Sequence, residues 1–70
     1  SGNGFEGQQQ RAESHCRSEA RRQGVDVRYG SKATVQGSYW TATVAGQLRG
    51  QSVQATGRDY PSGNRTELRF

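Results

Sequence analysis

Residues 5–23 read FEGQQQRAESHCRSEARRQ, and this stretch decides the fold. At about 100° per residue, an α-helix brings its apolar and small residues into one narrow sector. That sector contains Phe5, Ala12, Cys16, Ala20 and Gln23. The opposite side contains Arg11, Ser14, Arg17, Ser18, Arg21 and Arg22. The pattern predicts an amphipathic helix that docks a small-residue stripe on another layer and turns its charges to water.

Gly24 predicts the end of this helix, because glycine readily adopts the left-handed conformation that follows a last turn. Arg21 and Arg22 would lie in that turn, where cations suit the negative end of the helix dipole. Residues 1–4 are a Gly/Asn-containing lead-in that we expect to be flexible, and residues 5–70 are expected to form a single domain.

After Gly24 the sequence alternates with a period of two, which is typical of half-buried strands. We expect a first strand over residues 25–35, interrupted at Gly30-Ser31, with its buried side formed by Val25, Val27, Tyr29, Ala33 and Val35. Residues 39–45 carry the clearest strand pattern. There, Trp40, Ala42 and Val44 would share one face, and Tyr39, Thr41 and Thr43 the other.

Two further strands follow. Residues 46–50 are expected to be a hairpin loop before a strand whose inner face has Val53, Ala55 and Gly57. Residues 61–64 (Pro-Ser-Gly-Asn) have turn chemistry, and Thr66, Leu68 and Phe70 then alternate in a final strand. Connections this short cannot make parallel crossovers. The sequence therefore predicts an α+β fold, with one N-terminal amphipathic helix packed on a four-stranded antiparallel β-meander.

The small size and low hydrophobic content of the chain favour association with another protein chain. Seventy residues with 29% hydrophobic content give a thin core for a domain near the lower size limit. Self-association or a protein partner would supply the missing burial. No apolar run approaches the roughly 18–20 residues of a membrane span, so we expect no membrane insertion.

The charge is strongly basic. Nine of the ten cationic residues are arginines, and the formal net charge is +4. Such a charge attracts nucleic acid, anionic lipid or an acidic partner, but it also simply keeps a small domain soluble. The charge alone leaves these alternatives open.

The sequence offers little for catalysis. His15 and Cys16 are neighbours on one helix and cannot form the through-space hydrogen bond that a nucleophile and its base require. Cys16 is expected to pack in the stripe, with an intermolecular disulfide and catalysis as alternatives, and His15 is expected to be solvated at its margin. The carboxylates are scattered, and no phosphate-binding glycine motif appears. We therefore expect no enzyme, and no catalytic residue, cofactor, metal site or small-molecule substrate.

The sheet face away from the helix is the candidate interaction face, consisting of Arg28, Tyr39, Thr41, Thr43, Gln54, Thr56 and Arg69. Its flat, β-branched centre suits a protein partner or a dimer contact, and an edge strand could accept another strand. The alternative function is nucleic-acid binding, with Tyr39 as a stacking residue and Arg28 and Arg69 as phosphate neutralisers. An ordinary solvated sheet face is the third interpretation.

Cys16, the Arg21–Gly24 helix exit, the Tyr39-Trp40 strand and the strand-turn-strand of residues 53–63 carry a resemblance. Together they resemble small, uncharacterised bacterial envelope domains that pair one helix with a short antiparallel sheet. Such domains often carry a second cysteine in the penultimate strand, where this chain has Ala55-Thr56-Gly57. The resemblance implies an exported, periplasmic or secreted protein and no particular reaction, while a single cysteine also fits the cytoplasm.

Overall fold

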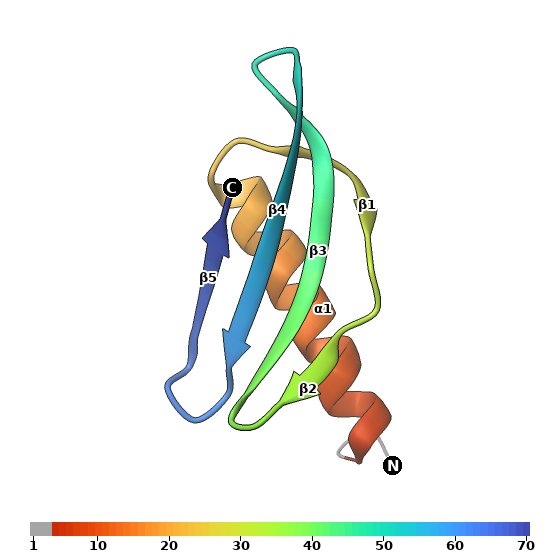
Figure 1. Ribbon diagram of the computed structural model, residues 1–70, viewed down its shortest axis with the longest axis vertical. Coiled ribbons are helices and arrows are strands. Elements are labelled where there is room, and N and C mark those ends of the chain that lie inside the picture. Colours follow the sequence, from red (N-terminus) through yellow and green to blue (C-terminus); the bar gives the residue numbers. More distant parts are fainter. Residues whose placement is uncertain (1–3) are drawn as a thin grey trace.

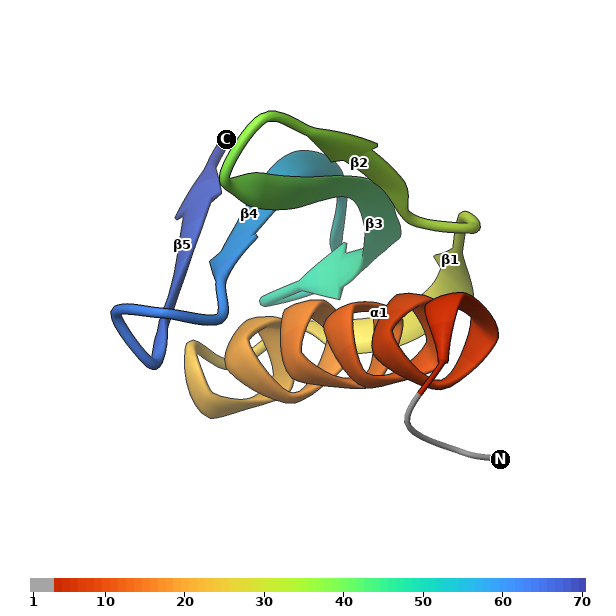
Figure 2. The same cartoon turned by 90° about the horizontal axis from the view of Figure 1, so that it is seen from below.

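The computed structural model describes residues 4–70, so residues 1–3 of the expected lead-in lie outside the described part of the chain. Helix α1 is followed by five strands: α1 (Phe5–Arg22), β1 (Asp26–Gly30), β2 (Thr34–Gln36), β3 (Tyr39–Leu48), β4 (Gln51–Tyr60) and β5 (Arg65–Arg69). The strands form one antiparallel sheet in the order β1-β3-β4-β5, and β2 also pairs with β3. Figures 1 and 2 show α1 lying across one face of this curled sheet. The predicted α+β architecture is confirmed.

The sheet has five strands rather than four, because the expected first strand is divided into β1 and β2. The Ala33 backbone turns towards the helix, where its N–H donates to Glu13 Oε2 at 2.8 Å. Its carbonyl accepts a hydrogen bond from Gln9 Nε2 at 2.9 Å. Ser31 Oγ meanwhile accepts from the Thr43 N–H at 2.8 Å. Side chains thus satisfy the backbone groups that a continuous strand would have paired.

The buried side expected for this first strand is only partly correct. Val25 and Ala33 are buried. A register shift between Val27 and Tyr29, however, marks a β-bulge, and Tyr29 is 57% exposed. Val35, in the short β2 strand, is 43% exposed. A bulge interrupts simple alternation, so the period-two pattern does not carry through to these residues.

The end of α1 follows the glycine prediction closely. Gly24 has φ +99°, and its N–H donates to the Arg21 carbonyl at 2.9 Å. The Val25 N–H donates to the Ala20 carbonyl at 2.9 Å. These two bonds make a Schellman motif, which directs the chain out of the helix and into the sheet.

The inner face of the sheet, which faces α1, forms the core. The helix contributes the buried stripe Ala12, Cys16 and Ala20, and the strands contribute Trp40, Ala42, Val44 and Ala55. Small side chains let the two layers approach closely: a Cβ at Gly57 would lie 2.6 Å from Cys16 Sγ. The three central residues of the predicted stripe, Ala12, Cys16 and Ala20, are confirmed as buried, and so are the predicted inner faces of residues 40–44 and 55–57.

Three residues predicted on the buried side lie at its periphery. Phe5 is 62% exposed, although its ring packs on Trp40 with 5.2 Å between centroids. Gln23 is the exposed C-cap residue after α1. Phe70 follows the last residue of β5 and is 57% exposed. All three stand at element ends, where no second layer continues to cover them.

The central hairpin is longer than expected. Leu48 pairs with Gln51, so the expected loop over residues 46–50 is reduced to Arg49-Gly50. Both turn residues have positive φ, +53° and +81°, as a type I′ turn requires. β4 correspondingly extends through Tyr60. This extension adds one inward residue, Asp59, and the outward residues Arg58 and Tyr60.

Candidate functional site

The outer face is the side of the sheet that points away from α1. Residues paired across antiparallel strands point to the same side, and Thr41 pairs with Arg58, Thr43 with Thr56, and Thr56 with Arg69. This register places six of the seven candidate residues on one surface, namely Tyr39, Thr41, Thr43, Gln54, Thr56 and Arg69.

Arg28, the seventh candidate, stands apart from Arg69. It follows Val27 at the β1 bulge and lines a separate hollow of about 450 Å³ together with Ala45 and Gln54. Arg28 Nε and Nη2 both donate to Asp26 Oδ2, at 3.1 Å and 2.9 Å. The charge of Arg28 therefore already has a carboxylate partner.

Two tyrosines and two arginines form a cluster on the outer face. The Tyr39 and Tyr60 ring centroids lie 5.2 Å apart. The Arg58 guanidinium lies 4.8 Å from the centre of the Tyr39 ring, and that of Arg65 lies 4.2 Å from the Tyr60 ring centre. A hydrogen bond to the Tyr60 side chain, and then the electrostatic effect of Tyr39, raise the pKa of Arg58 above its usual value. These cation–π contacts hold both guanidinium groups against the sheet.

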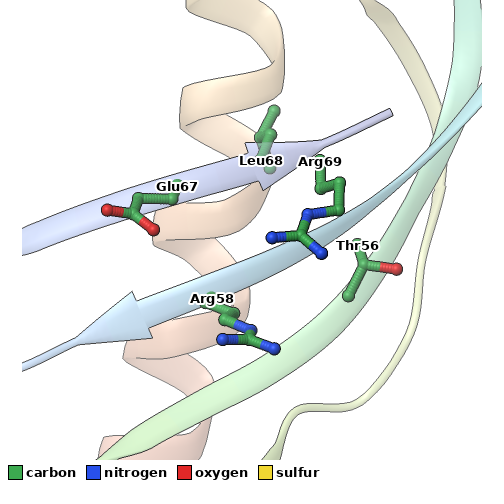
Figure 3. Close-up of a pocket in the computed structure, with 5 residues that line it drawn as sticks. All are labelled: Thr56, Arg58, Glu67, Leu68 and Arg69. Carbon is green, nitrogen blue, oxygen red and sulfur yellow. The ribbon is translucent and has the colours of Figure 1, made fainter.

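Beside this cluster the outer face is hollowed between β4 and β5. The hollow has a volume of about 480 Å³ and is lined by Thr56, Arg58, Glu67, Leu68 and Arg69. In Figure 3 the guanidinium groups of Arg58 and Arg69 lie on the same side of the strands as Thr56, while the Glu67 carboxylate lies apart from them. We call Arg58, Arg69 and Thr56 the outer arginine site.

The outer arginine site is positively charged, and its nearest acidic residue is Glu67, the cross-strand partner of Arg58. Glu67 Oε2 accepts instead from Arg65 Nε at 2.9 Å. Within residues 4–70, no carboxylate is paired with Arg58 or Arg69. An anionic group could therefore bind here without breaking an existing ion pair.

Sequence reasoning missed Arg58 because the expected strand stopped at Gly57. The sequence does contain the pattern that places it: Gln54, Thr56, Arg58 and Tyr60 stand at every second position, which puts them on one face of a strand. What the pattern could not supply is the β4–β5 register that brings Arg58 and Arg69 to the same hollow.

His15 is not merely solvated, as the sequence suggested. Its Nδ1 lies 3.0 Å from Oδ1 of Asp59, whose side chain is 5% exposed. Thr66 Oγ1 donates to the same Asp59 oxygen at 2.7 Å. Asp59 is the one buried charged residue in the described part of the chain. Continuing the inward alternation of Val53, Ala55 and Gly57 would have found it.

Cys16 has the properties of a packing residue. It is a fully buried free thiol, and burial, followed by the charge of Asp59, raises its pKa from 9.0 to about 11. A thiol with such a pKa is almost entirely protonated at neutral pH and is a poor nucleophile. His15 bonds to Asp59 rather than to this sulfur.

The helix charges are separate from the outer face. Hydrogen bonds from Arg22 and then Gln23 lower the pKa of Glu19 from 4.5 to about 2.

Across residues 4–70, no three His, Cys, Asp or Glu side chains are grouped to hold a metal ion. No helix among these residues is long and apolar enough to cross a membrane.

Comparisons with known proteins give no further guide. No protein-family model, curated protein or solved structure matches this chain. Function must therefore be argued from the surfaces themselves.

Proposed function

We propose that this domain is a non-catalytic interaction module and that its outer face binds an acidic, extended segment of a partner protein. The observation that carries the proposal is the outer arginine site, where two guanidinium groups that make no ion pair among residues 4–70 lie beside Thr56 in one hollow. Guanidinium groups bind carboxylates through paired, charge-assisted hydrogen bonds. An acidic side chain is the group that such a site best accommodates.

The spacing of the two arginines favours an extended ligand. Thr56 pairs with Arg69, so Arg58 is the diagonal neighbour of Arg69, and such Cβ atoms lie roughly 7 Å apart. Alternate residues of an extended strand are also roughly 6.6–6.8 Å apart. Acidic side chains at alternate positions of a peptide could therefore meet Arg58 and Arg69 in turn.

Nucleic-acid binding is the second candidate, and the tyrosine cluster favours it. Aromatic rings beside guanidinium groups are the usual elements of a stacking platform. Here, however, Arg58 and Arg65 already lie over the Tyr39 and Tyr60 rings, and the two rings also contact each other. A base would have to displace a guanidinium group to stack, so the acidic protein segment is the better fit.

The resemblance to envelope domains supports a proposal about the compartment in which this module acts. We propose that it belongs to an exported bacterial protein and acts in the periplasm or outside the cell. Self-association remains a variant of the same proposal, since the second chain would then supply the acidic segment.

Fluorescence anisotropy would test the proposal with three labelled probes. The first is a peptide with glutamate at alternate positions, the second its glutamine counterpart, and the third a single-stranded oligonucleotide of mixed sequence. We expect binding of the acidic peptide that weakens with salt, and little binding of the glutamine peptide. Tighter binding of the oligonucleotide would favour the second candidate and contradict the first.

Variants at the site sharpen this experiment. Arg58→Gln and Arg69→Gln should each weaken binding of the acidic peptide by about tenfold, because a hydrogen bond to a charged group contributes about 1.5–3 kcal/mol. Arg49→Gln removes the same charge from the exposed β3–β4 turn and serves as the matched control. Equal losses in all three variants would show that only net charge matters.

A further inference from the structure

A second cavity lies between the first half of α1 and the turn that joins β4 to β5. Its volume is about 250 Å³, and it is lined by Gln8, Arg11, His15, Asp59, Tyr60, Pro61 and Asn64. None of its lining residues belongs to the hollow between β4 and β5. It is smaller than the roughly 300–1,000 Å³ of pockets for drug-sized ligands, so its size suits a small molecule.

The buried carboxylate of Asp59 determines how His15 faces this cavity. Burying an ionised carboxylate is costly unless hydrogen bonds compensate it, and here Thr66 Oγ1 and His15 Nδ1 lie 2.7 Å and 3.0 Å from Oδ1. A carboxylate can only accept, so this network assigns a proton to Nδ1 of His15. Nε2 is then the ring nitrogen left for a ligand, on a side chain that is 44% exposed.

Arg11 supplies the second polar group for a ligand. It is exposed on α1, lines the cavity, and has no ion-pair partner within the described residues. The amide side chains of Gln8 and Asn64 add neutral donors, and Pro61 adds an apolar surface. Guanidinium, imidazole and amide donors beside an apolar wall suit a ligand with one anionic end and a short carbon body.

We propose that this cavity binds a small organic acid, with its carboxylate between Arg11 and Nε2 of His15. With its proton on Nδ1, neutral His15 has only an acceptor at Nε2, so a carboxylate binds there with uptake of a proton at Nε2; the imidazolium then donates to Asp59 from Nδ1 and to the ligand from Nε2. Pro61 offers an apolar surface to the carbon body of an organic acid, which inorganic phosphate lacks. The cavity shares no lining residue with the outer arginine site, and its ligand would be additional to the partner of the interaction module.

Amide NMR of the whole chain, titrated with benzoate, tests this proposal. We expect saturable shifts confined to the cavity, at His15, Tyr60 and Asn64, and weaker shifts with inorganic phosphate. Arg11→Gln should weaken benzoate binding by about tenfold, the effect expected for losing a charge-assisted hydrogen bond. His15→Asn should also weaken it, with circular dichroism to show that the variant is folded.

The matched control is Arg21→Gln, which removes an exposed arginine of α1 outside the cavity and should leave binding unchanged. The proposal is overturned by non-saturable or dispersed shifts, or by equal effects of Arg11→Gln and Arg21→Gln. Tighter binding of phosphate than of benzoate would overturn the carboxylate assignment. If His15→Asn does not fold, Arg11→Gln alone decides, because Arg11 is exposed and makes no ion pair among the described residues.

Discussion

The two faces of the β3–β4 hairpin differ in polarity although the same two strands form both of them. The inner face presents Trp40, Ala42 and Val44 to the helix, and all three are buried. The outer face presents threonines and the guanidinium of Arg58, which packs on Tyr39. Because side chains alternate along a strand, one hairpin can carry the stability of the domain on one side and a binding surface on the other.

The largest expected effect is on the inner face, at Trp40. Replacing a buried tryptophan by alanine costs about 3–5 kcal/mol, which is a large part of the roughly 5–15 kcal/mol that stabilises a typical domain. Trp40→Ala should therefore lower the midpoint of urea unfolding strongly and leave a measurable fraction of the chain unfolded even without urea. Thr41→Ala, its outer-face neighbour, should change the unfolding free energy by less than about 0.5 kcal/mol. Similar losses in both variants would contradict the division between faces.

Gly57 should show the next largest effect. An added Cβ would lie 2.6 Å from Sγ and 3.1 Å from Cβ of Cys16, and overpacking of this kind typically costs about 1–3 kcal/mol. We expect Gly57→Ala to lower the urea midpoint by a corresponding amount. In a Cys16→Ala background the added cost should be smaller, because the nearest atom is gone. An unchanged cost there would mean that the close approach of helix and sheet is not the cause.

The Cys16 thiol should make stability fall at high pH. Its pKa is raised by burial from 9.0 to about 11, so the unfolded chain loses this proton more easily than the folded one. The contribution of the protonated Cys16 thiol to the free energy of unfolding is fully present below pH 9.0 and is lost as the pH rises towards about 11. The unfolding free energy should decline less steeply in Cys16→Ala over the same range. Parallel curves, or rapid thiol labelling of the native protein, would contradict the burial of Cys16.

The smallest effect is expected at Glu19, which pairs with the exposed Arg22 on the helix. The hydrogen bond from Arg22 lowers the pKa of Glu19 to about 2. The ionised Glu19 therefore contributes to the free energy of unfolding above pH 4.5, its ordinary pKa, and this contribution is lost as the pH falls towards 2. Exposed helix pairs contribute only about 0.2–0.5 kcal/mol. Glu19→Gln should therefore shift thermal unfolding slightly at pH 7 and less at pH 3. A loss as large as that of Gly57→Ala would overturn the assignment of stability to the inner face.

Local periodicity explains what the sequence could predict. The stripe Ala12, Cys16 and Ala20 follows from helical spacing, and the two faces of residues 39–44 follow from alternation. Gly24 marked the helix end because the left-handed conformation there favours glycine. These features depend on neighbours within a few residues, so the sequence specifies them directly.

Contacts between distant segments explain what it could not. The division of β1 from β2 depends on Glu13 and Gln9, which bond to Ala33 across 20 and 24 residues. The bond between His15 and Asp59 spans 44 residues. No spacing rule connects such positions; they become neighbours only once the helix has docked on the sheet.

The adjacent residues Gly57 and Arg58 offer the most direct test of the claim that stability and binding lie on opposite faces of one strand. Unfolding free energy and affinity for the acidic peptide would be measured on Gly57→Ala and Arg58→Gln. The account predicts that Gly57→Ala loses about 1–3 kcal/mol of stability yet binds normally where it is folded. Arg58→Gln should lose no more than about 1 kcal/mol, the size of an exposed cation–π contact, and should bind about tenfold more weakly. A loss of stability in Arg58→Gln as large as that of Gly57→Ala, or unchanged binding, would contradict it.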